Sequence, residues 1–290
     1  MDTWGASAAF DLSTWHPHYD VWLLIGSLSA FYLFALIRLA PALAPAGRPP
    51  ASRRQVVCFM AGVVAMWVGA DWPVHELAED FLFSVHMTQH MLFSFIAPPL
   101  LMLGVPAWLL RAVLRPAWLM AAVRFIGRPF IALVIFNGVL VFTHWPVVVD
   151  LSLRVEPAHF LIHVMIFTSG VAMWLPVIEP LPQFKALQPP AKMFYLFLQS
   201  IVPTVPASFL TFADAPIYKL YETFPRLWGI GVLVDQQMAG LIMKIGGGLL
   251  LWVVIATIFF RWSSREESGV VDTVSWDDFE RELEAFKMRK

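Results

Sequence analysis

The chain has 290 residues, of which 59% are hydrophobic and 14% are charged. Soluble domains carry about a quarter charged residues, so this composition and the mean hydropathy of +0.68 exclude an ordinary soluble protein and indicate an integral membrane protein. The formal net charge of −1 gives no reason to expect a nucleic-acid partner. The single cysteine, Cys58, excludes an internal disulfide and a thiolate cluster, so a metal site would need His, Met, Asp, Glu or Gln ligands.

Seven segments are apolar enough to span a membrane, which takes about 20 mostly apolar residues in helical form. In chain order they are residues 21–39, 56–70, 83–103, 130–143, 158–178, 193–212 and 237–260. Proline-rich connectors separate them, and proline disfavours continuation of a helix. We therefore predict an all-α polytopic bundle, with an outer N-terminal segment at 1–20, seven transmembrane helices within 21–262 and a cytoplasmic tail at 263–290 that holds a short amphipathic helix. No Lys or Arg precedes Arg38, so the first segment lacks the basic start of a signal peptide and is expected to remain as a span.

The basic residues predict the orientation, because cytoplasmic connectors are enriched in Lys and Arg. The odd-numbered connectors and the tail hold most of them: Arg38, Arg48, Arg53, Arg54, Arg111, Arg115, Arg124, Arg128, Lys185, Lys192, Arg261 and Arg265. The even-numbered connectors hold only Arg154, Lys219 and Arg226, and carry acidic residues instead. Seven spans then alternate without conflict, with the N-terminus outside and the C-terminus in the cytoplasm.

The histidines are the strongest functional signal in the chain. On the predicted topology all eight lie on the outer side. His86 and His90 begin the third span, and His159 and His163 begin the fifth; residues four apart share one face of a helix. His144 closes the fourth span at the same depth. Ionisable groups inside a membrane are costly and are functional candidates by default, so we predict one site formed by these five imidazoles.

The ligand types point to a transition metal. Imidazole suits Cu, Zn, Fe and Ni, and affinity peaks at copper in the divalent series. Thioethers that would favour Cu(I) lie near the same depth: Met87, Met91, Met165, Met238 and Met243. Methionine is also an ordinary packing residue of apolar helices, so these alone carry little weight. We predict His86, His90, His159 and His163 as the main copper ligands, with His144 as the fifth.

Polar residues at the start of the seventh span complete the predicted site. Asp235 and Gln237 are expected to orient the imidazoles or gate the site. His16, His18 and His75 are better interpreted as interfacial hydrogen-bonding residues than as ligands. The sequence contains no clear nucleophile–base pair and no nucleotide-binding loop, so we do not expect an enzyme.

Three other functions remain open. The two His pairs could instead ligate haem b in an electron carrier beside a quinol site. A metal-ion transporter would need polar groups along the whole path, but the inner halves of the spans are almost wholly apolar. A structural scaffold would need no metal at all.

Several motifs occur together in one order over about residues 20–260. They are His86-Met87-Thr88-Gln89-His90-Met91, Ala97-Pro98-Pro99-Leu100, Gly104-Val105-Pro106, Thr143-His144-Trp145-Pro146, His159-Phe160-Leu161-Ile162-His163, Trp174-Leu175-Pro176-Val177 and Asp235-Gln236-Gln237-Met238-Ala239-Gly240. With them the chain resembles the polytopic CtaG-type cytochrome c oxidase assembly factors associated with caa-type oxidases. It does not resemble the single-span copper chaperone that shares the name.

The resemblance implies a seven-helix inner-membrane protein needed to mature a haem-copper oxidase, by handling copper on the outer side. The expected partners are oxidase subunits, a periplasmic copper donor and the lipid bilayer. One position departs from the family pattern: Met243-Lys244 stands where Met-Trp is expected. The depth and contacts of the seventh span are therefore left open.

Overall fold

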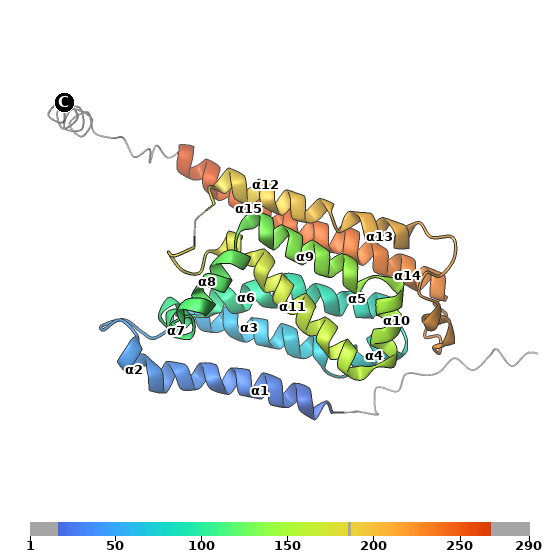
Figure 1. Cartoon of the computed structure of the whole chain (residues 1–290), viewed down its shortest axis with the longest axis horizontal. Coiled ribbons are helices and arrows are strands. Elements are labelled where there is room, and N and C mark those ends of the chain that lie inside the picture. The colour runs from blue at the N-terminus through green and yellow to red at the C-terminus, as the bar shows by residue number, and fades with distance from the viewer. Residues whose placement is uncertain (1–16, 185–186, 268–290) are drawn as a thin grey trace, which may run out of the picture.

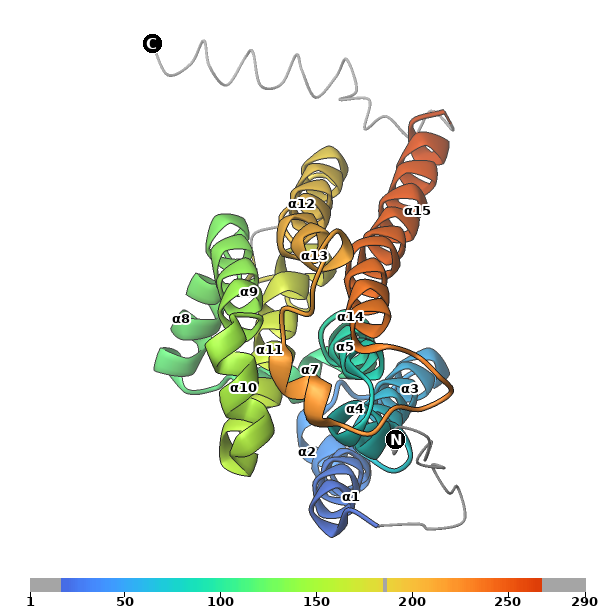
Figure 2. The same cartoon turned by 90° about the vertical axis from the view of Figure 1, so that its right-hand side faces the viewer.

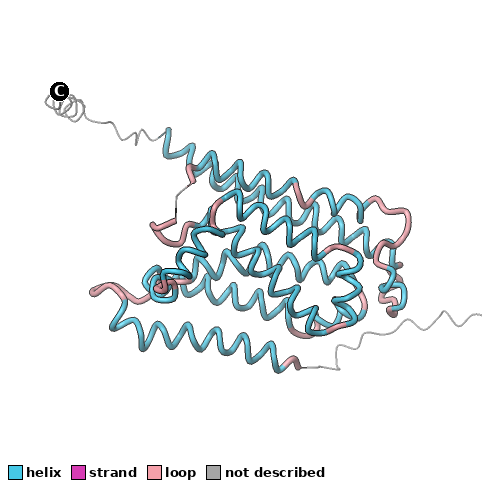
Figure 3. The backbone as a smooth tube through the Cα atoms, in the orientation of Figure 1, coloured by secondary structure: helices cyan, strands magenta, loops and turns pink. Residues whose placement is uncertain are grey.

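A computed structural model describes residues 17–184 and 187–267, and every regular element within these ranges is a helix. The long helices lie side by side and roughly parallel (Figures 1 and 3). Five of the described helices are long and apolar enough to cross a membrane, and two bent pairs raise the number to as many as seven. The predicted all-helical polytopic fold is thus confirmed. His16 and the predicted tail helix lie outside the described residues.

The helices that make up the candidate spans follow the predicted segments in order. They are α1 (Tyr19–Phe34), η1 (Ala35–Leu39), α2 (Ala40–Leu43), α3 (Arg53–Ala70), α5 (Phe83–Met91), η2 (Leu92–Ile96), α6 (Ala97–Gly104), α9 (Pro129–Thr143), α11 (Glu156–Ile178), α12 (Pro189–Ile201), α13 (Thr204–Thr211), α14 (Val232–Leu241), η4 (Ile242–Gly246) and α15 (Gly247–Glu267). Several of them extend past their predicted limits, α3 and α15 among them. Helix α3 starts at Arg53 because Ser52 and Gln55 form a capping box, and α15 continues beyond residue 262.

Shorter helices lie at the two ends of the bundle (Figure 1). They are α4 (Val74–Asp80), α7 (Ala107–Val113), α8 (Ala117–Ile126), α10 (Pro146–Arg154) and η3 (Lys219–Thr223). Helices α4 and α10 and the α13–α14 connector (residues 212–231) lie at one end, which we call the α10 end. Helices α7 and α8 lie at the opposite end, and α8 meets α9 at a bend of 77°.

The helix formed by α5, η2 and α6 is joined to α11 at a turn that contains a proline. Pro98 has no N–H to donate, so the Ser94 carbonyl lacks its usual partner four residues ahead. Trp174 Nε1 on α11 donates to that carbonyl at 3.2 Å. Gly170 lies against the same turn, and a Cβ there would stand 2.7 Å from Ser94 O. The helix that begins with α5 can therefore approach α11 closely.

Candidate metal centre

Two pairs of imidazoles face each other across α5 and α11. The ring centroids of His86 and His90 are 4.3 Å apart, as are those of His159 and His163. Across the helix interface, His86 lies 5.5 Å from His159, and His90 lies 5.6 Å from His163, again between centroids. The close approach at Gly170 thus brings together four of the predicted ligands.

Three of these imidazoles form a compact set that we call the three-histidine site: His86, His159 and His163. One ring nitrogen from each lies within 4.8 Å of the others. His159 Nε2 and His163 Nε2 are 3.0 Å apart, too close for both lone pairs to face each other without a proton or a cation between them. His86 Nδ1 is buried and has no hydrogen-bond partner among the described residues. Such a donor set suits a small cation.

His90 and His144 lie beside this set. The His90 and His144 ring centroids are 5.5 Å apart, and His90 is one turn further along α5 than His86. His144 follows α9 directly, and its Nδ1 donates to Leu140 O at 2.7 Å. Its Nε2 is therefore the nitrogen that remains for a ligand. The structure brings all five predicted histidines together but places only three of them in the compact set.

Glu79 is a candidate site residue that sequence reasoning missed. Its Oε1 lies 3.0 Å from His159 Nδ1 and 2.9 Å from His75 Nε2. An N–H from His159 Nδ1 to this carboxylate leaves His159 Nε2 unprotonated toward the three-histidine site, which is a common way to orient a metal-binding imidazole. The available signal was the His75-x-x-x-Glu79 spacing on α4, which puts both residues on one helical face.

His75, predicted as an interfacial residue, is hydrogen-bonded on both sides. Beyond Glu79, its Nδ1 lies 3.4 Å from Gln89 Nε2, which also donates to Gly69 O at 2.6 Å. The His18 and His75 ring centroids are 4.7 Å apart. These residues connect the three-histidine site to the start of α1.

Asp235 acts on the backbone of α5. Its two carboxylate oxygens accept the N–H groups of Phe83 and Ser84 at 2.8 and 3.0 Å. A carboxylate in the first turn satisfies helix N–H groups that have no partner within the helix. Asp235 is fully buried and so fixes the start of the helix that carries His86 and His90.

The two glutamines after Asp235 hold the α13–α14 connector. Gln237 Nε2 donates to Ala213 O at 3.0 Å, so its hydrogen bond goes to the connector backbone. Gln236, which sequence reasoning did not assign, accepts the N–H groups of Ile217 and Tyr218 and donates to Tyr218 O. The role of Gln237 at an imidazole stays a prediction, and the hydrogen bond that it makes in the structure goes to Ala213 O.

The α13–α14 connector covers the α10 end of the bundle. Figure 2, which looks onto this end, shows it crossing in front of α5. The Tyr218 hydroxyl donates to His144 O at 2.8 Å, and Tyr218 and Tyr221 both pack on Phe83. Burial raises the pKa of both phenols, so they stay protonated at neutral pH. The connector thus packs on the start of α5 and on the backbone of His144.

Comparison with known proteins identifies relatives and a family. The chain is 23% identical to an uncharacterized protein of Mycobacterium leprae (strain TN) over 256 residues, which is 82% of this chain and 37% of that protein. The chain therefore spans well under half the length of this curated relative. No solved structure matches. Residues 30–265 match the model of the cytochrome c oxidase caa3 assembly factor family, so the chain belongs to the CtaG-type oxidase assembly factors.

Proposed function

We propose that this assembly factor binds copper at the three-histidine site and supplies it to a haem-copper oxidase. The observation that carries the proposal is the convergence of His86, His159 and His163 from two facing helices, with one nitrogen each within 4.8 Å. The three imidazoles bind as neutral ligands, and the one carboxylate beside them, Glu79, balances a single positive charge. A monovalent cation therefore costs less to bury there than a divalent one, which favours Cu(I).

Charge supports an orientation with the α10 end facing the periplasm. Helices α7 and α8 and their flanks, at the opposite end, carry Arg111, Arg115, Arg124 and Arg128. Basic residues are enriched on the cytoplasmic side. Copper would then arrive from a periplasmic donor and leave to an oxidase subunit in the same inner membrane.

The geometry disfavours the haem b alternative. The cavity beside the cluster, lined by His90 and His144, has a volume of about 20 Å³. That is room for about one water molecule, far less than a porphyrin needs. In addition, the imidazoles on α5 and α11 stand too close to each other for a macrocycle to lie between them.

The transporter alternative requires a polar path away from the site. Polar side chains do occur among α9, α11 and α12, where Asn137, Gln199 and Tyr195 are linked by hydrogen bonds of 2.8 Å and Tyr195 donates to Met173 O. These groups satisfy one another, as polar residues between membrane helices commonly do. They support helix packing rather than ion passage.

Copper stoichiometry tests the proposal. We expect the detergent-purified triple variant His86→Ala/His159→Ala/His163→Ala to bind at least one copper ion fewer per chain than the wild type, measured by elemental analysis. His18→Ala removes an imidazole outside the three-histidine site and should bind as the wild type does. Equal copper in all three proteins, or a Soret band in the purified wild type, would overturn the proposal.

A further inference from the structure

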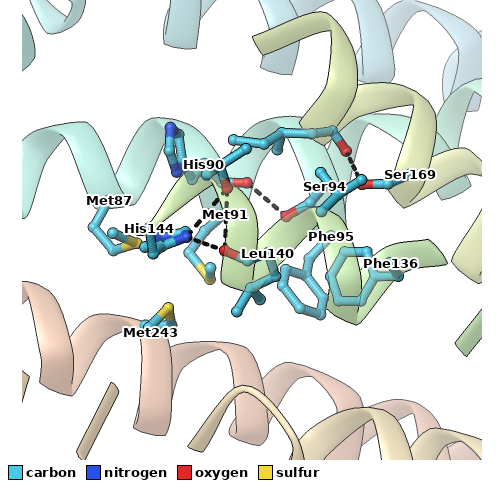
Figure 4. Close-up of a pocket in the computed structure, with 13 residues that line it drawn as sticks. Met87, His90, Met91, Ser94, Phe95, Phe136, Leu140, His144, Ser169 and Met243 are labelled. Carbon is cyan, nitrogen blue, oxygen red and sulfur yellow. Dashed lines mark hydrogen bonds between the residues drawn. The ribbon is translucent and has the colours of Figure 1, made fainter. Parts of the chain in front are cut away.

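We infer that the protein holds a second site for a soft monovalent cation, separate from the three-histidine site. This inference rests on the proposed copper function and deepens it. The site is the thioether cavity, a small space between α5, α9, α11 and η4 whose lining includes Met87, Met91, Met243, His90 and His144. Figure 4 shows the three sulfur atoms and the His144 ring facing this space.

Unpartnered imidazole nitrogens distinguish this cavity from ordinary methionine packing. His90 is only 5% exposed, and among the residues that the structure describes neither of its ring nitrogens has a hydrogen-bond partner. His144 Nε2 is likewise buried without one, because the hydrogen bonds of this ring, with Leu140 O and Thr143 Oγ1, involve Nδ1. Buried polar atoms are nearly always hydrogen-bonded or ligated. Two histidines that line one small cavity therefore carry nitrogens without partners, which points to a ligand that accepts lone pairs.

The donor set selects the class of cation. Thioether sulfur is a soft, uncharged ligand that binds Cu(I) well and hard divalent ions poorly. Met87 and Met243 are almost completely buried, and no carboxylate lines the cavity. Two imidazoles and up to three thioethers leave the charge of the cation uncompensated, which again favours a charge of +1. Ag(I), which has the same preferences, is the matching probe.

The positions of the two sites suggest how they cooperate. The His90 ring lies 4.3 Å from His86 and 5.6 Å from His163, between centroids, and also lines the thioether cavity. A cation can therefore pass from the three-histidine site to the thioether cavity by exchange of one ligand at a time. Copper stays Cu(I) in both sites, so the transfer requires no electron and no reductant.

The π-helical turns place the thioethers. Met91 directly precedes the π turn η2, and Met243 lies inside the π turn η4. Such turns add a residue to a helical turn and are frequent at functional sites. They rotate the following residues relative to a regular helix, which affects which side chains face the cavity. The Met243-Lys244 departure from the family pattern thus falls within a segment that shapes this site.

The test uses the full chain under anaerobic conditions, titrated with Cu(I) against a chromogenic chelator. The wild type should bind two equivalents and show a copper–sulfur shell by X-ray absorption. Met87→Leu/Met91→Leu/Met243→Leu conserves side-chain volume and should lose one equivalent and the sulfur shell. Met238→Leu, at an exposed position on α14, should keep both. The His86→Ala/His159→Ala/His163→Ala variant should keep the sulfur shell.

A second measurement avoids any mutation. Wild-type protein labelled with selenomethionine and loaded with Cu(I) or Ag(I) should show a metal–selenium distance at the selenium edge. Two copper equivalents without sulfur or selenium ligands would overturn the inference and leave the proposed function standing. Loss of the sulfur shell in the three-histidine variant would show that the two sites are one, and would also overturn it. A wild type that binds no Cu(I) would overturn both proposals.

Discussion

Helices α1 and α11 have the same hydropathy but opposite places in the bundle. Both have a mean hydropathy of 1.9 in their most apolar window, yet 17% of that window is buried in the span of α1 and 50% in α11. Helix α1 packs mainly on α3 and leaves large apolar side chains exposed, as expected of a surface that faces lipid. Hydropathy therefore identifies a span without saying whether lipid or protein surrounds it. The buried helix is the one that carries site residues.

Two matched glycine substitutions give the largest expected contrast between these helices. Gly170→Ala places a Cβ 2.7 Å from Ser94 O and 2.8 Å from Ser94 Cα, so α11 must move away from η2. We expect a loss of about 3 kcal/mol in stability, or failure to accumulate. At Gly26 on α1 a Cβ meets nothing within 4 Å, so Gly26→Ala should be neutral or stabilise by up to about 1 kcal/mol. Thermal unfolding in detergent measures both; equal effects would break the contrast.

Removal of the carboxylate behind the site should weaken metal binding without loss of a ligand. Glu79→Gln keeps the shape of the side chain but weakens its interaction with His159 Nδ1 and His75 Nε2. We expect copper affinity to fall by about 10- to 100-fold, in line with other groups that orient metal ligands. Glu222→Gln, at an exposed position on the connector, is the control. Unchanged affinity in Glu79→Gln would remove Glu79 from the site.

The buried carboxylate on α14 should matter more than an exposed one nearby. Asp235→Ala leaves the N–H groups of Phe83 and Ser84 without their acceptor. We expect a loss of about 2 kcal/mol, the upper part of the range for helix N-terminal caps, together with weaker copper binding because α5 carries His86 and His90. Asp214→Ala, on the exposed connector, should change the unfolding temperature little. If both variants melt alike, Asp235 does not secure α5.

The smallest effect is expected where α1 attaches to α3. Trp22 Nε1 and Trp67 Nε1 both donate to Asp71 Oδ2 at 2.7 Å. Trp22→Phe removes one of these bonds while the other remains, so we expect a loss of about 1 kcal/mol and unchanged copper binding. A measurable change in copper affinity would show that α1 is coupled to the site.

The apolar segments and prolines of the chain were enough to predict the spans and their order. A helix needs about 20 apolar residues to cross a membrane, and each backbone N–H or C=O without a hydrogen bond there costs free energy. Local composition therefore decides where a helix can cross. The four-residue spacing of the histidines likewise fixes which imidazoles share a helical face. These are local rules, and they hold whatever the neighbouring helices do.

Contacts between residues far apart in the chain decided which helix faces meet. Gly170 and Trp174 bring α11 against the Ser94 turn, and that approach pairs His159 and His163 with His86 and His90. Glu79 reaches His159 from a helix about 80 residues earlier. A pattern within one helix does not show contacts with a segment so far away in the sequence, so the Glu79 carboxylate was missed.

The Asp235-Gln236-Gln237 block shows the same limit at the scale of one helical turn. All three residues were visible as polar groups at the start of a span, but consecutive residues on a helix point about 100° apart. Asp235 faces the start of α5, Gln236 binds the backbone around Tyr218, and Gln237 binds Ala213 O. Residue type and spacing supplied the candidate ligands. The packing of α5, α11 and α14 then divided these candidate ligands between the three-histidine site and the thioether cavity. Side chains from different helices lie in the same space only when the helices pack against each other.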